Sequence, residues 1–201
     1  MLPRKKEDMS KEEMYKLTEE KIKSIKADIH LFTDGSTSGK QENGGAGVFI
    51  QNAETGEEIY SAMFPAGKWC SSYGGESIAM REAVKWIRQS GQPSRKYLIA
   101  TDSRSLLDAI KANDWKDEDP VLNEIKEEIK QNEADITILW VPSHCGTAGN
   151  EKADKIADEA RQLDQQTTKV SRKIVRAKKK GKKWEITHPR AKETCMERRA
   201  P

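Results

Sequence analysis

Short blocks of apolar residues, separated by turn residues, follow the charged start of the chain. The block 27–36 (ADIHLFTDGS) is apolar until turn residues break it, which predicts a strand with Asp34 at its carboxyl end. The blocks 44–52 and 57–64 are also apolar, and Gly56 in the segment between them suits a hairpin turn. The three blocks predict three strands in an antiparallel meander.

Helical and strand patterns alternate in the second part of the chain. Apolar residues recur at helical spacing in 76–89, so Glu76 is expected in the first turn of a helix. The block 96–103 (KYLIATDS) is almost continuously apolar, as in a strand buried on both faces, and Asp102 lies at its end. Helix, helix, strand and closing helix are then predicted over 105–110, 121–131, 134–144 and 150–163. The order βββαβααβα favours an α/β fold, a mixed sheet with helices packed on its faces.

The two ends of the chain differ from this middle part. Residues 1–26 are highly charged with loosely spaced apolar positions, which predicts a charged N-terminal helix or a linker. Residues 166–201 lack apolar periodicity and are expected to form a disordered basic tail. From Thr167 onward there are thirteen Lys and Arg against three Glu, whereas the preceding residues carry 23 against 30 acidic residues. The net charge of +3 therefore comes from the tail.

Composition argues against several classes of protein. No apolar run approaches the roughly 20 residues of a membrane span, and the start of the chain is too charged for a signal peptide. The three cysteines are an odd number without metal-ligand spacing, so neither a disulfide framework nor a zinc site is indicated. We expect an intracellular protein, in the nucleus or cytoplasm, with one globular domain and no membrane partner.

Four acidic residues fall where a sheet of this kind presents its ligand site. Asp34 and Asp102 end predicted strands, Glu76 begins a helix, and Asp154 lies in the last helix. Mg²⁺ prefers a few carboxylates together with water and phosphate oxygens, so carboxylates from separate elements suit it. Two such ions about 3.5–4 Å apart can activate a water and stabilise the leaving oxygen of a phosphodiester. We predict a site for two Mg²⁺ ions, which Mn²⁺ could replace, and raised carboxylate pKa values without metal.

A histidine follows the last predicted strand. His144 lies in the glycine-containing segment SHCGTAGNE, which is typical of a loop. A neutral imidazole near pH 7 can move a proton to or from an activated water or a leaving group. We assign His144 that role.

Four strings of residues carry a resemblance to a known family. TDGS (33–36), GGES (74–77), TDS (101–103) and VPSHCGTAGNEKAD (141–154) resemble the type 1 ribonuclease H family. The last string is similar to the form found in retroelement polyproteins, notably those of non-LTR retrotransposons. The resemblance implies a ribonuclease H-like fold with a five-stranded mixed sheet, in a domain spanning 27–165. It also implies two-metal hydrolysis of the RNA strand of RNA–DNA hybrids, with a role in reverse transcription of a retroelement.

The resemblance assigns individual residues as well. The family's metal carboxylates correspond to Asp34, Glu76, Asp102 and Asp154, and its loop histidine to His144. Substrate contacts are implied for Ser71 and Ser72 with a DNA phosphate, for Gly35, Ser36, Ser103 and Arg104 with the minor groove, and for Asn150 and Glu151 with the RNA side. The implied partner is an RNA–DNA hybrid, and we expect a monomer. A reverse transcriptase domain or polyprotein is the second partner that the retroelement form suggests.

Two other functions fit parts of the same pattern. A nucleic-acid-binding module could keep the fold and the basic tail without cutting, although four intact carboxylates argue against it. An integrase-like or resolvase-like enzyme would use the same metal chemistry on DNA, but the TDGS and HCGTAGNE strings disfavour it. The basic tail could be a nuclear address, a nucleic-acid tether or a solvated remnant, and composition leaves these three alternatives open.

Overall fold

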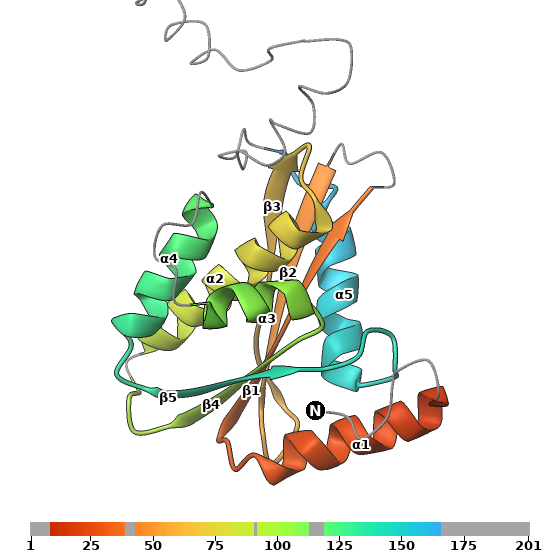
Figure 1. The fold of residues 1–201 in the computed structure, drawn as a ribbon, viewed down its shortest axis with the longest axis vertical. Helices are drawn as coiled ribbons and strands as arrows, with labels where there is room; N and C mark the ends of the chain where they lie inside the picture. Colours follow the sequence, from red (N-terminus) through yellow and green to blue (C-terminus); the bar gives the residue numbers. More distant parts are fainter. Residues whose placement is uncertain (1–8, 39–42, 91, 113–118, 166–201) are drawn as a thin grey trace, which may run out of the picture.

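The chain folds into one five-stranded sheet with helices on both faces (Figure 1). A computed structural model describes residues 9–38, 43–90, 92–112 and 119–165; the predicted basic tail lies outside the described residues. The elements are α1 (Lys11–Ser24), β1 (Ile29–Thr37), β2 (Asn43–Asn52), β3 (Glu58–Lys68), α2 (Ser72–Ser90), β4 (Lys96–Thr101), α3 (Arg104–Lys111), α4 (Pro120–Lys130), β5 (Asp135–Trp140) and α5 (Ala148–Ala160). The predicted α/β class and the order βββαβααβα are confirmed, with α1 preceding them.

The sheet combines an antiparallel and a parallel half. Its strand order is β3-β2-β1-β4-β5, in which β1, β2 and β3 pair antiparallel while β4 pairs parallel with both β1 and β5. Gly56 lies between β2 and β3 with a φ of 71°, a left-handed conformation that suits glycine and the predicted turn. The pairing between β1 and β4 ends at Thr33 and Thr101. Asp34 and Asp102 therefore each lie one residue beyond the last pair of these two neighbouring parallel strands.

Strand β1 is longer than the sequence predicted. We expected it to end beside Asp34, but it continues to Thr37 because residues 34–37 pair with β2 after the pairing with β4 has stopped. Gly35 and Ser36 are therefore ladder residues, and tertiary pairing overrides their local preference for a turn. As a result, a paired strand on the β2 side fixes the backbone of Asp34.

The two faces of β1 pack into two separate clusters of apolar side chains. Leu31 belongs to the larger cluster, under α2, α3 and α4, whereas Phe32 belongs to the cluster under α1 and α5. Side chains of neighbouring strand residues point to opposite faces, which explains why both are buried. Burial of each such side chain contributes roughly 1.5–3 kcal/mol. The parallel centre of the sheet is therefore a rigid support for the residues that follow it.

Helix α2 begins four residues earlier than predicted. It begins at Ser72, so Glu76 lies in its second turn and the glycines 74 and 75 are inside the helix. Glycine is required by the close approach of α2 to β1: a Cβ on Gly35 would collide with the backbone nitrogen of Glu76, and one on Gly75 would lie 2.8 Å from the carbonyl oxygen of Gly45. Packing of backbone on backbone thus stabilises a helix start that the glycines alone disfavour.

Helix α5 lies directly on the backbone of β2. A Cβ on Gly47 would collide with the carbonyl oxygen of Ala153 and would lie 2.6 Å from the backbone nitrogen of Ala157. Gly47 is also the β2 partner of Asp34. Because β2 carries no side chain at this point, α5 can approach β1 closely and bring Asp154 beside Asp34.

Helix α1 crosses the lower part of the molecule in Figure 1, where β1 begins. Its N-terminus is fixed by a capping box, in which Ser10 and Glu13 bond each other's backbone N–H. Met14, Thr18 and Ile22 are buried on one side of the helix. The described part of the N-terminal segment is therefore a packed helix. No helix within the described residues has the length and apolarity to span a bilayer.

Candidate functional site

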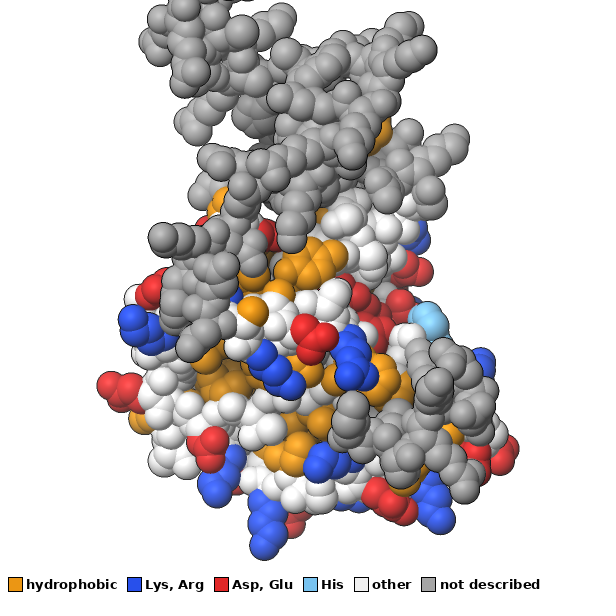
Figure 2. Space-filling view, viewed as in Figure 1, with side chains coloured by type: hydrophobic (Ala, Val, Ile, Leu, Met, Phe, Trp, Pro, Cys, Tyr) orange, Lys and Arg blue, Asp and Glu red, His pale blue; other side chains and the backbone are white. Residues whose placement is uncertain are grey.

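Three carboxylates from three elements converge at the carboxyl end of the parallel strands. Asp34 comes from β1, Glu76 from α2, and Asp102 directly follows β4. One carboxylate oxygen of each lies within 4.8 Å of the others. The side chains of Asp34 and Glu76 are buried, with 5% and 7% of each residue exposed. We call these three residues the carboxylate cluster; Figure 2 shows acidic side chains gathered beside a histidine on this face.

Burial and mutual repulsion raise two of the pKa values in the cluster. The pKa of Asp34 is raised to about 8, first by burial and then by the charge of Asp102, although the N–H of Gly35 donates to Asp34 Oδ1 at 2.7 Å and opposes the rise. The pKa of Glu76 is raised to about 10, again by burial first and then by Asp102 and Asp34. The predicted rise in pKa is thus found for Asp34 and Glu76, and burial contributes more to it than the repulsion we expected.

Asp154 connects the carboxylate cluster to His144. The side chain of Asp154, on α5, is hydrogen-bonded to Asp34, and its Oδ2 lies 3.8 Å from Nδ1 of His144. Glu151 lies about one turn earlier on α5, and its carboxylate joins a second group in which ligand atoms of His144, Glu151 and Asp154 lie within 4.8 Å of one another. The structure thus brings the four predicted carboxylates and the predicted histidine into one continuous region.

The donor set of the carboxylate cluster fits a hard divalent cation. Oε2 of Glu76 is buried and has no hydrogen-bond partner among the described residues. A buried oxygen without a partner is costly unless a proton or a cation satisfies it. Mg²⁺ takes oxygen ligands and tolerates few protein donors, so Asp34, Glu76 and Asp102 suit it, with Asp154 at the side. Binding would also lower the raised pKa values by opposing the repulsion.

Trp140, which was not predicted as a site residue, contacts the backbone of Asp102. The indole Nε1–H of Trp140 donates to the backbone carbonyl oxygen of Asp102 at 3.0 Å, and the guanidinium of Arg104 lies 5.7 Å from the centre of the same ring. Trp140 pairs with Thr101 across β4 and β5. The signal was present in the sequence, since aligning the two predicted parallel strands places Trp140 beside the residue that precedes Asp102.

The predicted substrate residues lie around this region in different settings. At the start of α2, Ser71 accepts a hydrogen bond from the N–H of Gly74, Ser72 is the first helical residue, and Gly35 of β1 packs on the helix. Ser36 is hydrogen-bonded to Asp158, Ser103 donates its N–H to Thr101, and Arg104 lies over the ring of Trp140. On α5, Asn150 is buried and Glu151 accepts a hydrogen bond from the N–H of Gly146. Their roles toward a substrate remain proposals. Asn150 is only 3% exposed, so it can act on a substrate only through its neighbours.

Solved structures with the same architecture define the class of this protein as the ribonuclease H fold. The N-terminal RNase H domain of rv2228c from Mycobacterium tuberculosis is 18% identical, with a TM-score of 0.55 over 67% of this chain and 94% of that chain. LC11-RNase H1, isolated from compost, is 20% identical, with a TM-score of 0.54 over 67% and 96%. At these identities the likeness shows the fold.

Comparison of sequences gives the particular family. The RNase H family model matches residues 26–162, and the chain belongs to this family. Ribonuclease H of Hyphomonas neptunium is 31% identical over 143 residues, covering 64% of this chain and 89% of the relative. Ribonuclease H of Rhizobium meliloti is 29% identical over 141 residues, covering 64% and 87%. Helix α1 lies before the matched segment.

Proposed function

We propose that this protein is a ribonuclease H that hydrolyses the RNA strand of RNA–DNA hybrids, with Asp34, Glu76, Asp102 and Asp154 as metal ligands. The observation that carries the proposal is the cluster of buried carboxylates with raised pKa values at the end of the parallel strands. Membership of the RNase H family and the ribonuclease H names of the curated relatives support the substrate.

The chemistry assigns different roles to the residues. Bound at this site, two Mg²⁺ ions would supply the activation of water and the stabilisation of the leaving oxygen. Asp34 is central because it lies close to the other two members of the carboxylate cluster, Glu76 and Asp102, and also to Asp154. His144 is exposed and close to Asp154, so its imidazole can take a proton from the attacking water or pass one to the leaving group. Hydrolysis then gives a 5′-phosphate and a 3′-hydroxyl.

The residues around the carboxylate cluster supply the substrate contacts in this proposal. Ser71 and Ser72, at the start of α2, would bind a phosphate of the DNA strand, helped by the helix N-terminus. The remaining contacts would come from Gly35, Ser36, Ser103 and Arg104 in the minor groove and from Glu151 on the RNA side, where the buried Asn150 would act through its neighbours. Shape and 2′-hydroxyl groups, and not base sequence, would then select the hybrid.

The experiment is a cleavage assay with a labelled RNA–DNA hybrid, with and without Mg²⁺, alongside double-stranded DNA and RNA. We expect cleavage of the RNA in the hybrid alone, a requirement for Mg²⁺, and an inactive Asp102→Asn variant that still binds. If the hybrid is bound but never cut, the protein is a binding module. Cutting of duplex DNA would move it to the integrase-like class.

A role of this protein in the reverse transcription of a retroelement is a separate part of the proposal. It depends only on the similarity of residues 141–154 to retroelement forms, while the curated relatives compared above are bacterial ribonucleases H. A reverse transcriptase would then be the partner, and the site of action would be the nucleus or the cytoplasm. Co-purification of this chain with a reverse transcriptase from its source would support the role, and its presence in cells without one would oppose it.

A further inference from the structure

The loop that carries His144 has a conformation that requires support. His144 has a φ of 52° and Gly146 a φ of 96°, both in the left-handed region. For a residue other than glycine such a backbone is uncommon and costs roughly 1–3 kcal/mol unless its surroundings hold it. The side chain of His144 supplies little support, since it is 68% exposed and 3.8 Å from Asp154, which is longer than a hydrogen bond.

Contacts within the loop account for part of its conformation. Cys145 is buried, and its Sγ lies 3.5 Å from Oγ1 of Thr147. The N–H of Gly146 donates to Oε1 of Glu151 at 3.3 Å, which ties the loop to the first turn of α5. Both contacts are long and involve weak or exposed partners, so they leave room for a second support.

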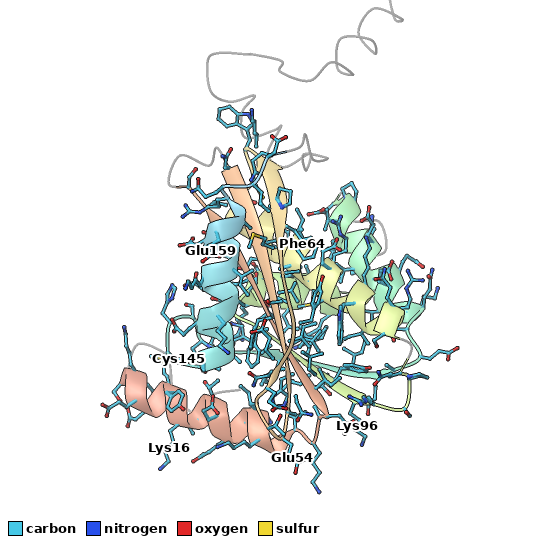
Figure 3. The ribbon with its side chains drawn as sticks, turned by 180° about the vertical axis from the view of Figure 1, so that it is seen from behind. Lys16, Glu54, Phe64, Lys96, Cys145 and Glu159 are labelled. Atoms are coloured by element: carbon cyan, nitrogen blue, oxygen red, sulfur yellow. The ribbon has the colours of Figure 1, made fainter. Side chains whose placement is uncertain are left out.

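Helix α1 lies beside the loop, and Tyr15 is its residue nearest to Gly146 among those that a side chain at this position would meet. A Cβ on Gly146 would lie 3.7 Å from Cδ2 of Tyr15, so the edge of the tyrosine ring lies beside this glycine, while 45% of Tyr15 is exposed to solvent. Ile22, two turns further along α1, is in the same apolar cluster as Val141 and Ala153, which flank the loop on both sides. In Figure 3 the labelled Cys145 lies just above α1 and beside the lower end of α5.

We propose that α1, through Tyr15, is a positioning element that holds the loop 143–147 and so sets the orientation of His144. The inference rests on the proposed function, in which His144 moves a proton. Helix α1 lies outside the segment that the family model matches, so this support is an addition to the family domain. The alternative is that α1 only covers the apolar side chains of the sheet.

A double-mutant cycle on hybrid cleavage separates the two explanations. We expect Tyr15→Ala to lower kcat about three- to tenfold with KM unchanged, because a small displacement of a proton-transferring group affects chemistry more than binding. Tyr15→Phe, which keeps the ring, should restore the rate, and Lys16→Ala, at the next exposed position of the same helix, is the matched control. In a His144→Ala background, Tyr15→Ala should have no further effect. The same loss of kcat in that background, or no loss in the native one, would overturn the proposal.

Amide hydrogen exchange tests the same contact without activity. In Tyr15→Ala the exchange of the Gly146 N–H should accelerate at least tenfold, while the core amide of Ile99 keeps its native rate. Unchanged exchange at Gly146 would overturn the inference, as would equal acceleration at both amides. If the native protein cuts no hybrid, the proposed function fails, whereas the exchange result still decides whether α1 holds the loop.

Discussion

Replacing Asp34 by asparagine should stabilise the metal-free protein at neutral pH. The pKa of Asp34 is about 8 in the folded protein against 3.8 for its ordinary value. Between these values the folded state binds a proton that the unfolded state has released, so the free energy of unfolding falls as pH rises from about 4 to 8. Each pH unit in this range lowers it by about 1.4 kcal/mol, which gives an upper limit of about 4 kcal/mol at pH 7.

Asparagine mimics the protonated carboxyl and loses this pH dependence. Its Oδ1 can still accept from the N–H of Gly35, and its amide can donate to Asp154, as the protonated Asp34 does. Coupling to the other carboxylates reduces the gain, so we expect about 2–4 kcal/mol at pH 7 and almost none at pH 4. For a chain of this size that corresponds to a rise in Tm of roughly 5–12 °C.

The assay is thermal unfolding in a chelator at pH 4.5 and pH 7.5, with Asp135→Asn, an exposed aspartate at the start of β5, as the matched control. The control should change Tm by less than about 2 °C at both pH values. The reasoning is refuted if Asp34→Asn is no more stable than the native protein at pH 7.5, or if its gain is equal at the two pH values. Adding Mg²⁺ should stabilise the native protein more than the variant.

Three further outcomes follow from the same geometry. Mg²⁺ binding at pH 7 should release one to two protons, because Asp34 and Glu76 must ionise to bind it; calorimetry in buffers of different ionisation enthalpy measures this, and zero release contradicts it. Trp140→Phe loses the hydrogen bond to Asp102, so kcat should fall several-fold with about 1 kcal/mol of lost stability by urea unfolding; an unchanged kcat would exclude a supporting role. Gly47→Ala should lower the free energy of unfolding by about 1–3 kcal/mol, because the added methyl group forces α5 away from β2. An unchanged urea concentration at the midpoint of unfolding would disprove this.

Local patterns were sufficient to predict the core of the site. Asp34 and Asp102 each follow an apolar strand pattern, and the parallel pairing of β1 and β4 places them side by side. Asp154 was assigned to the site from its place in the last predicted helix, and His144 from its glycine-containing segment, but these patterns do not say how closely α5 approaches β1. The structure supplied that information through the contact of α5 with Gly47.

Other features depend on contacts between distant parts of the chain. The extension of β1 to Thr37 requires β2 as a partner, and the early start of α2 requires the backbone of Gly35 beneath it. The buried side of α1 was not predicted, because its apolar residues are few and their partners lie on other elements. Propensity describes a residue and its neighbours in sequence, so it cannot find a preference created by packing.

The glycines of β2 that lie against α5 limit how this protein can be stabilised. In most strands a glycine is a weakness, because its freedom in the unfolded chain destabilises the fold by roughly 0.5–1 kcal/mol relative to alanine, and replacement is a standard way to gain stability. At Gly47 the missing side chain is what allows the helix backbone to approach. Directed evolution for heat resistance alone should therefore leave Gly45 and Gly47 unchanged. These two glycines contribute no ligand atom to the site, but their lack of a side chain sets the distance between the carboxylates of β1 and α5.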